Sequence, residues 1–568
     1  MSDQLKSFQG QIRNYQKENL EELRRFKKIV FERPTNTSGK KTGHPARSTI
    51  KGLEPYTGLW NEPQAAHLLK RTLFGVKQSE LSHFTSISLN EAVNEILDQE
   101  EAIAPPVNNY NDLIESPDPD VPAGETWTTA PYNLDIEYAR LISLKGWIIN
   151  NMLTQKASIH HKLTLFWHNL LPTQFIDLFI AKMSYQYYNM LHKHALGNYK
   201  TMISELTTNP AMLFFLNGIY NVKEAPDENY ARELQELFTL GKGPDSNYTE
   251  GDVYEAARVL TGWTVDWQTV ENEGEPQYIF NQYGHDTGDK QFSAFYNNRV
   301  ISGRSGQDGK NETGELLEMI FENEETARYI CRRIYNFFVY HEVDDNAELN
   351  VIRPMAEIFR TNNYEIKPVL EALLKSAHFY ESANLGAYIK SPLDHVLSLL
   401  RVFDIAFPAD YTAQYQFGEN VYWQLAILGQ EIGDPPSVAG WQAYHQQPTF
   451  DKIWINTDTA TKRAQLQDYL VYNLVDLPAF ISKLQNPGNV YDLINDCSGL
   501  FLGIEINEEV VNALKDTLLS GQQSEAYWTY AWDNYINEPE NDEYRSTVEN
   551  RLKAMFQQFF QLSEFQLM

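Results

Sequence analysis

Residues 227–263 read DENYARELQELFTLGKGPDSNYTEGDVYEAARVLTGW, the pattern of two helices joined by a Gly-rich turn. Apolar residues recur in both halves at the spacing of one buried helical face. Gly241 lies where the first helix should stop. Thr249 and Asp252 have the spacing of a capping box, which predicts a second helix from about residue 250 to about residue 262. Because similar apolar patterns recur along the chain, we expect a mainly α-helical protein: a large multi-helical globular body with little β structure.

The first of these two helices carries several ionisable side chains among its apolar residues. Asn229, Glu233 and Glu236 project to one side, and Arg232 can pair within the helix. Such groups are costly to bury unless they are paired, ligating or solvated. Glu233, Glu236 and Arg232 are therefore candidate catalytic residues. The alternative is a structural network in which Arg232 and Arg258 neutralise the two glutamates.

Two histidine segments are further candidates. His168 ends an apolar helix, where it can act as a base, a metal ligand or a helix cap. His285 and Asp286 are adjacent in a polar segment, although neighbours in sequence often point apart. With Glu233, these residues make up a candidate site for a divalent metal, His168, Glu233, His285 and Asp286 being its ligands. Packing in the core or in an ion-pair network is the alternative for each of them.

The composition indicates a large globular protein, and the charge is distributed unevenly along the chain. Its 568 residues are 42% apolar and 13% aromatic, which suits a large packed core. Residues 1–51 carry a local charge of +7 in a chain of −29. We expect four segments: a basic amphipathic helical arm at 1–33, a flexible linker at 34–50, a main helical domain at 51–463 with a polar insertion at about 266–312, and a C-terminal helical portion at 464–568 packed on the main domain.

Several helices, two strand-like segments and one loop are predicted inside this frame. The apolar period of 3.6 predicts helices at 62–73, 136–153, 160–170, 183–206, 315–339 and 354–378. Alternation at 277–281 and 291–295 indicates a small hairpin-like excursion, and the Pro- and Asp-rich residues 104–126 indicate an exposed loop.

Other features limit the class of protein. A body this acidic repels nucleic acid, so we expect no nucleic-acid partner. No apolar run is long enough for a membrane span, and the N-terminal residues lack a secretory signal, so we expect a cytoplasmic start. Cys331 and Cys497 are expected to be buried free thiols. Phosphate-loop, dinucleotide, zincin and α/β-hydrolase motifs are absent from the sequence.

Nine segments carry a resemblance to a known family. They are AAHLLKRTLFG (65–75), LTLFWHNLL (163–171), ENYARELQELFTLG (228–241), YTEGDVYEAARVLTGW (248–263), GHDTGDKQF (284–292), LLKSAHF (373–379), IKSPLDHV (389–396), DPPSVAGW (434–441) and LSEFQLM (562–568). In these segments and in their order the chain resembles the bacterial family called domain of unknown function 1800. Asn229, Arg258, Trp263 and Trp441 are the structural positions of the motifs that we single out.

The resemblance implies a mostly helical bacterial protein of unassigned activity. It also implies a partner, because such proteins are often encoded beside members of domain of unknown function 1501, which resemble alkaline phosphatases and sulfatases. The resemblance thereby also implies export of the chain bound to that partner. One position departs from the family pattern: a second histidine is common two residues after the one matching His168, and here that residue is Leu170. A metal site built on that histidine pair would lose a ligand.

Two hypotheses of different classes follow, and the sequence leaves open whether the protein is an enzyme. The first is a partner-binding subunit of a complex with a phosphatase- or sulfatase-like protein, in which the charged helices serve as scaffold. The second is a metal-assisted hydrolase or oxidase, in which His168, Glu233, Glu236, His285 and Asp286 converge on one pocket.

Overall fold

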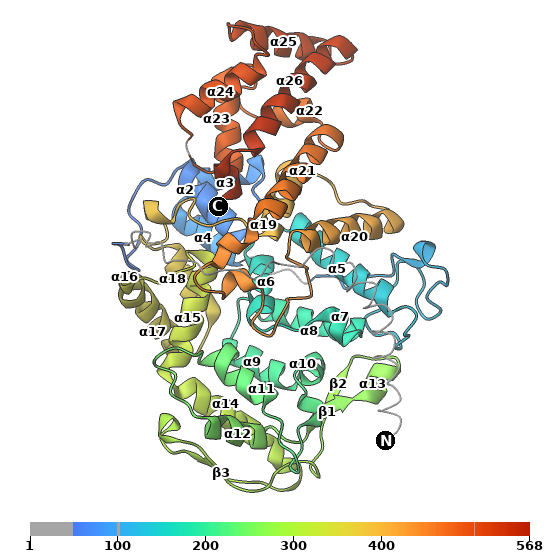
Figure 1. Ribbon diagram of the computed structural model, residues 1–568, viewed down its shortest axis with the longest axis vertical. Coiled ribbons are helices and arrows are strands. Elements are labelled where there is room, and N and C mark those ends of the chain that lie inside the picture. Colours follow the sequence, from blue (N-terminus) through green and yellow to red (C-terminus); the bar gives the residue numbers. More distant parts are fainter. Residues whose placement is uncertain (1–48, 99–102, 505) are drawn as a thin grey trace.

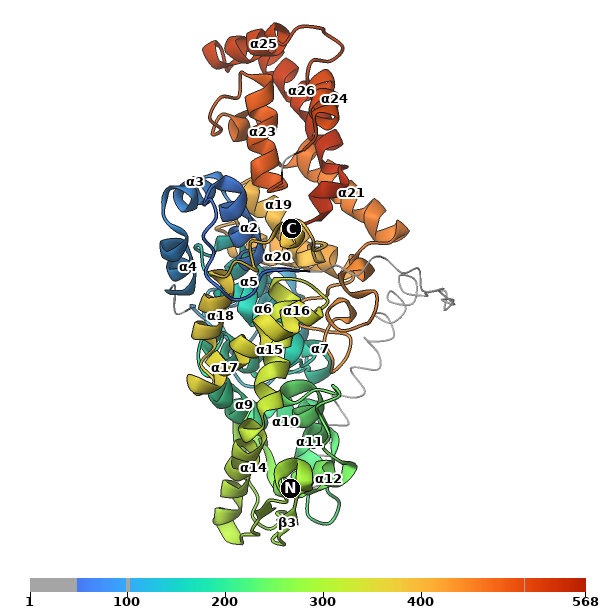
Figure 2. The ribbon, with the colours of Figure 1, turned by 90° about the vertical axis from the view of Figure 1, so that its left-hand side faces the viewer.

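The computed structural model describes residues 49–98, 103–504 and 506–568. Within these ranges the chain is mainly α-helical and contains two small two-stranded sheets, which confirms the predicted fold class. The molecule is elongated: helices of the C-terminal portion lie at one end, and α12 (Glu250–Val259) and β3 (Lys290–Gln291) lie toward the other (Figures 1 and 2). The predicted arm and the predicted linker up to residue 48 lie outside the described residues.

The first half of the body is built from short and medium helices. They are α2 (Glu62–Thr72), α3 (Gln78–Ser86), α4 (Leu89–Asp98), α5 (Glu137–Thr154), α6 (His160–Leu170), α7 (Phe175–Leu178), α8 (Ala181–Lys193), α9 (Tyr199–Thr208) and α10 (Pro210–Phe215). The helices predicted at 62–73, 136–153 and 160–170 correspond to α2, α5 and α6. The single helix predicted at 183–206 is wrong, because it is divided into α8 and α9. Asn198 ends the connection and caps α9 by accepting the Thr201 N–H at 3.1 Å.

In the second half of the body, too, segments predicted as single helices are divided. Its helices are α11 (Asn229–Glu233), the π-helix η3 (Leu234–Thr239), α12, α13 (Trp267–Glu271), α14 (Asn311–Glu322), α15 (Glu324–Phe338), α16 (Asp345–Ala347), the π-helix η6 (Glu348–Ile352), α17 (Arg353–Thr361), α18 (Ile366–Leu374), α19 (Pro392–Val402) and α20 (Tyr411–Ile427). The helices predicted at 315–339 and 354–378 are also each two helices. Asn323 caps α15 by accepting the Glu325 N–H at 2.9 Å. Asn363 and Tyr364, at φ 49° and 64°, separate α17 from α18.

The strands lie in and beside the predicted polar insertion. β1 (Trp263–Asp266) pairs antiparallel with β2 (Gln277–Phe280), with Trp263 opposite Phe280. β3 pairs antiparallel with β4 (Val300–Ile301). Of the two segments predicted as one hairpin-like excursion, 277–281 contains β2, whereas 291–295 contributes only Gln291 to β3 and then enters the 3-10 helix η4. The predicted pairing was wrong because the alternation in each segment does not identify its partner strand.

Short 3-10 helices make many of the remaining connections. They are η1 (Asn111–Leu113), η2 (Gly218–Tyr220), η4 (Ala294–Tyr296), η5 (Gly306–Lys310), η7 (Ser382–Asn384), η8 (Gln442–Tyr444) and η9 (Phe450–Trp454). The loop at 104–126, which contains η1, is anchored and only partly exposed. Asp118 is buried and accepts from Arg140 Nη2 at 2.8 Å, and the same guanidinium lies 3.2 Å from Glu137. The loop thus supplies one carboxylate of a buried ion-pair network.

The C-terminal portion is a group of helices that extends from the body (Figure 1). It comprises α21 (Thr457–Asn473), α22 (Leu477–Ile481), α23 (Val490–Phe501), α24 (Glu508–Leu518), α25 (Ala526–Asn537), α26 (Asp542–Phe560) and η10 (Ser563–Gln566). α23 packs against α2, and the chain after α26 returns to the body, where Lys390 N donates to Gln566 O at 2.8 Å. The domain boundaries predicted from the sequence stay predictions.

Two further observations concern the described residues. Cys331 and Cys497 are buried free thiols, as predicted. Among the described helices, none combines the length and the apolar character that crossing a membrane requires.

Candidate functional site

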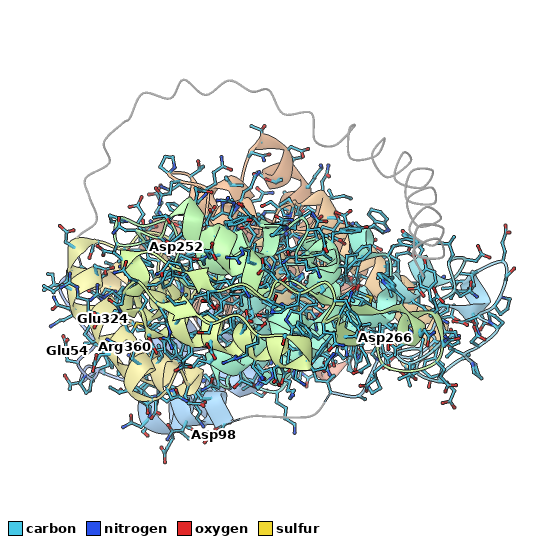
Figure 3. All side chains as sticks on the ribbon, turned by 90° about the horizontal axis from the view of Figure 1, so that it is seen from below. Glu54, Asp98, Asp252, Asp266, Glu324 and Arg360 are labelled. Atoms are coloured by element: carbon cyan, nitrogen blue, oxygen red, sulfur yellow. The ribbon has the colours of Figure 1, made fainter. Side chains whose placement is uncertain are left out.

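The segment that the sequence singled out folds as α11, η3, a turn and α12. The predicted capping box is present: Thr249 Oγ1 accepts the Asp252 N–H at 3.2 Å, and Asp252 accepts the Thr249 N–H at 2.7 Å. Asp252, which is labelled in Figure 3, also accepts from the N–H and hydroxyl of Ser293, both at 2.7 Å. The start of α12 is therefore tied to the polar insertion. The first helix differs from the prediction, because α11 gives way to a π-helix after Glu233.

The charged side chains of this segment form pairs near the surface. Arg232 pairs with Glu228 at 2.9 Å, as predicted, but its second partner is Glu250 at 2.6 Å. Glu236 pairs with Lys242. The sequence placed the carboxylate of Glu236 within reach of Arg232 along a regular α-helix, and the wider turn of the π-helix changes the direction in which it projects.

Glu233 differs from the other charged residues of this segment in its burial and in its hydrogen bonding. Its side chain is largely buried, and Oε2 has no hydrogen-bond partner among the described residues. Burial and, after it, the Glu236 carboxylate raise the pKa of Glu233, while Lys242 and Arg232 oppose that shift. A carboxyl of this kind retains its proton at higher pH than an exposed glutamate. It lies directly before a π-helix, an element that is frequent at functional sites.

His168 lies in a different environment. It is fully buried near the end of α6, within contact of the rings of Phe175 and Trp441. Its Nδ1 lies 3.2 Å from Tyr187 Oη, and the Tyr187 hydroxyl donates to the Leu171 carbonyl. The imidazole is therefore the donor in that contact. Burial lowers the pKa of His168 to about 3, so the ring is neutral near pH 7.

The backbone beside His168 holds the Trp441 segment in place. Asn169 Oδ1 accepts the Trp441 N–H at 2.9 Å, and a Cβ on Gly440, whose φ is 83°, would lie 2.2 Å from the Asn169 carbonyl oxygen. The segments 163–171 and 434–441, far apart in sequence, are thus packed backbone to backbone. These contacts make His168 and Trp441 parts of a tightly packed region.

His285 and Asp286 join a third group of residues, at the polar insertion. Arg258 donates to both oxygens of Asp286, at 2.9 and 3.0 Å, and lies 2.6 Å from Glu255. His285 Nε2 lies 3.2 Å from the buried Glu312, which also pairs with Lys290 at 2.5 Å. Adjacent in sequence, the two residues point to different partners and fasten the insertion to α12 and α14.

The remaining structural positions of the motifs lie nearby. Trp263 Nε1 donates to Thr313 Oγ1 at 2.9 Å, which joins β1 to α14. Asn229 begins α11, and its N–H is bound by Asp227 Oδ1 at 2.9 Å. Both residues have local structural contacts.

The residues predicted as one metal site therefore have separate partners. Glu233 and Glu236 belong to the π-helix segment, His168 to the packed end of α6, and His285 and Asp286 to the insertion. Among the described residues, no group of three or more His, Cys, Asp and Glu side chains is arranged to hold a metal ion. The metal hypothesis receives no support from this part of the chain.

A second charged centre, which sequence reasoning missed, surrounds the start of α19. Asp394 is buried there; one of its oxygens pairs with Lys162 of α6, and the other accepts from Ser391 Oγ at 2.8 Å. Lys390 and Lys70 are buried beside it. We call Lys70, Lys162, Lys390 and Asp394 the lysine centre. It contains three amines and one carboxylate in a protein whose overall charge is −29.

The electrostatics of the lysine centre follow from this imbalance. Burial, opposed by Asp394 and reinforced by Arg463, lowers the pKa of Lys390 to about 7. Burial and the neighbouring Lys390 lower the pKa of Lys70 well below its ordinary value. The pKa of Lys162 is also lowered, because the effect of its burial outweighs the attraction of Asp394. Uncompensated buried amines of this kind are rare in packed cores and typical of functional sites.

A signal for this centre is present in the sequence. Lys70 stands in AAHLLKRTLFG and Lys390 in IKSPLDHV, both among apolar residues and both in segments that carry the family resemblance. The criterion applied to residues 227–263, a charge inside an apolar-periodic segment, applies equally here. The sequence does not reveal that α2, α6 and α19 meet in the folded protein.

The fold and its charged centres define the class of this protein: a large, mainly α-helical protein with a buried lysine centre and a helical C-terminal portion. The chain belongs to the family described as protein of unknown function (DUF1800), whose model matches residues 67–567. The basic residues 1–51 lie before the matched region. No curated protein and no solved structure is detectably similar to the chain.

Proposed function

We propose that this chain is a partner-binding subunit that docks its partner on α25. The composition of that helix is the observation that carries the proposal. Trp528, Trp532 and Tyr535 are buried on its inner face, whereas Tyr527 and Tyr530 are 51% and 69% exposed on the outside. A helix with apolar or aromatic residues on all sides is normally covered all round. Exposed tyrosines of this kind are enriched where proteins bind one another.

The charge around α25 favours a partner with a basic surface. Residues 516–544 contain seven Asp and Glu and neither Lys nor Arg. Tyr491, 41% exposed, extends the aromatic surface, because its hydroxyl donates to Glu525 at the start of α25 at 3.2 Å. Two cations from outside this range reach the surface, since Arg551 Nη1 donates to the Tyr527 carbonyl at 3.2 Å and Lys515 Nζ lies 3.6 Å from Glu525. Acidic side chains still outnumber them, and an aromatic centre with a mainly acidic rim suits a partner patch that offers apolar pockets surrounded by Lys and Arg.

The partner that the family resemblance implies is a phosphatase- or sulfatase-like protein of domain of unknown function 1501. We infer that a basic patch on such a protein covers α25. The basic arm at 1–33 is a second docking segment suggested by sequence, and it lies outside the described residues. Deleting the arm and altering α25 therefore separate the two possibilities.

The test uses the full chain and the partner encoded beside it. Native mass spectrometry measures the stoichiometry of the complex and any bound metal, and calorimetry measures the dissociation constant. The double variant Tyr527→Ala/Tyr530→Ala should weaken binding about tenfold or more, because truncation of an aromatic anchor commonly costs about 2 kcal/mol. Both side chains are exposed, so the variant should remain folded.

Tyr283→Ala is the matched control, since Tyr283 is 77% exposed and lies in the polar insertion. It should bind the partner like the natural chain. Equal binding by the α25 double variant, or loss of binding only on deletion of residues 1–33, would overturn the assignment to α25. Absence of any complex would overturn the proposed function.

A second candidate function is proton transfer at Glu233, the part of the enzyme hypothesis that keeps an observation in its favour. The unpartnered Oε2 and the raised pKa of Glu233 suit a general acid. The metal-assisted form of the hypothesis predicts stoichiometric metal that is lost in Glu233→Ala. Elemental analysis of both proteins after dialysis against Zn²⁺ or Mn²⁺ tests it, and absence of bound metal in the natural chain removes that form.

A further inference from the structure

The lysine centre faces a small space between the body and the C-terminal portion. Lys70 from α2 and Lys390, two residues before α19, both line this space. Its opposite side comes from α23 and from the segment 562–568. The space has room for about one water molecule and is partly open to solvent. A ligand with a chain or a ring does not fit there, so only the smallest reactants can occupy it.

The amine of Lys70 is buried and lacks a partner. Lys70 is 8% exposed, and its Nζ has no hydrogen-bond partner among the described residues. A Cβ on Gly503, whose φ is 69°, would lie 2.8 Å from that Nζ, so glycine leaves the amine its space. Burial and the neighbouring Lys390 lower the pKa of Lys70, so its nitrogen has a free lone pair at lower pH than an exposed lysine does. A desolvated lysine of this kind, beside another cationic group, is a nucleophile.

The groups around this amine carry an excess of positive charge. Asp394 also lines the space, but its oxygens are engaged by Lys162 and Ser391. Lys390 Nζ donates to the Phe565 carbonyl at 2.8 Å and lies 4.2 Å from the centre of the Phe565 ring. A carbonyl and a ring face stabilise a cation without cancelling its charge. One carboxylate therefore serves two amines even when Lys70 is neutral.

A negative charge on Lys70 itself would remove this imbalance. When Lys162 and Lys390 are protonated, they carry two positive charges against the single negative charge of Asp394. One more negative charge at the Lys70 nitrogen would bring the lysine centre to two charges of each sign. Buried charges are tolerated when they are paired, so the surroundings favour an anionic form of Lys70 over an ammonium.

We propose that Lys70 is a site of reversible carboxylation by carbon dioxide. The lone pair on its Nζ attacks the carbon of CO₂. The N–C bond forms as one C–O π bond breaks, and that electron pair stays on oxygen as the charge of the carbamate. The proton released from the nitrogen goes to the amine of Lys390, and loss of CO₂ returns it. This modification site goes beyond partner docking and does not depend on it.

A carbamate fits where a ligand with a chain does not. Its carbon is bonded to the nitrogen, so both of its oxygens lie closer to Nζ than a hydrogen-bonded water molecule does. One oxygen takes the place of such a water molecule, and the other lies toward the opening to solvent. An acetyl group has a similar size, but it carries no charge and would leave the excess of amines as it is.

Carbon-13 NMR of the full chain in labelled bicarbonate at pH 7 tests the proposal. We expect a carbamate resonance, separate from those of bicarbonate and CO₂, that is lost in Lys70→Met. Methionine has a similar length and removes a buried amine without a partner, so this variant should fold and melt no lower than the natural chain. Lys452→Met, at an exposed lysine, is the control and should retain the resonance.

Two further measurements locate the carbamate and its proton. Triethyloxonium ion converts a carbamate to a stable ethyl ester, and peptide mapping of the labelled natural chain should find this ester at Lys70, about tenfold or more above its level at Lys452. Lys390→Met, which lacks the proton acceptor, should lose most of the resonance. Absence of a carbamate resonance, an equal resonance in Lys70→Met, or an undiminished resonance in Lys390→Met would each overturn the proposal.

Discussion

Lys390→Met should make this protein more stable, by an amount that depends on pH. Burial lowers the pKa of this amine from 10.5 to about 7. The shift of about 3.5 units corresponds to about 5 kcal/mol of folding free energy that the natural chain forgoes at pH 7. Methionine removes that penalty and loses the hydrogen bond to the Phe565 carbonyl, worth about 1 kcal/mol. The net gain is therefore about 4 kcal/mol at pH 7.

The sign of the pH dependence follows from proton binding. Between pH 7 and pH 10.5 the unfolded lysine holds a proton that the folded one has lost, so the stability of the natural chain rises with pH in that window. Lys390→Met lacks this contribution. Its advantage should shrink from about 4 kcal/mol at pH 7 to about 1 kcal/mol at pH 9. Asp394 and Arg463, the charged groups that act on the amine, are present in both proteins, as is Lys70, whose pKa Lys390 lowers.

Thermal unfolding by calorimetry at pH 7, 8 and 9 measures this difference. The natural chain, Lys390→Met and the exposed-site control Lys452→Met are compared in the same buffers. The control should follow the natural chain at every pH. A constant difference between Lys390→Met and the natural chain, or a lower melting temperature at pH 7, would refute the reasoning. Either result would mean that Lys390 is charged and well compensated in the fold.

Three further substitutions or reactions test the packing. Arg140→Met should lower the free energy of unfolding by about 3–5 kcal/mol, because it leaves the buried Asp118 carboxylate unpaired; thermal unfolding measures this. Gly75→Ala should lower the melting temperature well below that of Gly521→Ala, since both glycines have positive φ but only the first faces a close backbone. Cys331 should resist thiol reagents at pH 8 until the protein is denatured, because burial raises the pKa of its thiol.

The helical fold could be predicted from the sequence because apolar periodicity is a local signal. The breaks at Asn198 and Asn323 were missed because the apolar pattern continues across them. A single capping asparagine is enough to start a new helix in a new direction. The π-helix after Glu233 was missed for a related reason: it widens one turn without changing which residues are apolar.

The sites were harder to predict because they depend on contacts between distant segments. Lys162 and Asp394 are 232 positions apart, and Lys145 pairs with Asp434 across 289 positions. Nothing in the spacing of either residue identifies its partner. Reasoning from sequence therefore favoured residues 227–263, where several charges stand in one segment and can be read together.

The two kinds of charged segment differ in a way that sequence reasoning can use. In residues 227–263 both signs occur within a few positions, and the structure shows them pairing locally, as Arg232 does with Glu228. Lys70 has no acid within seven positions on either side, so its charge must be met by a distant segment or by a ligand. The structure brings Lys390 to it instead of a carboxylate. A basic side chain in an apolar helix without a nearby acid, such as Lys70 beside Arg71, thus indicates contacts with distant segments more strongly than a cluster of mixed charges does.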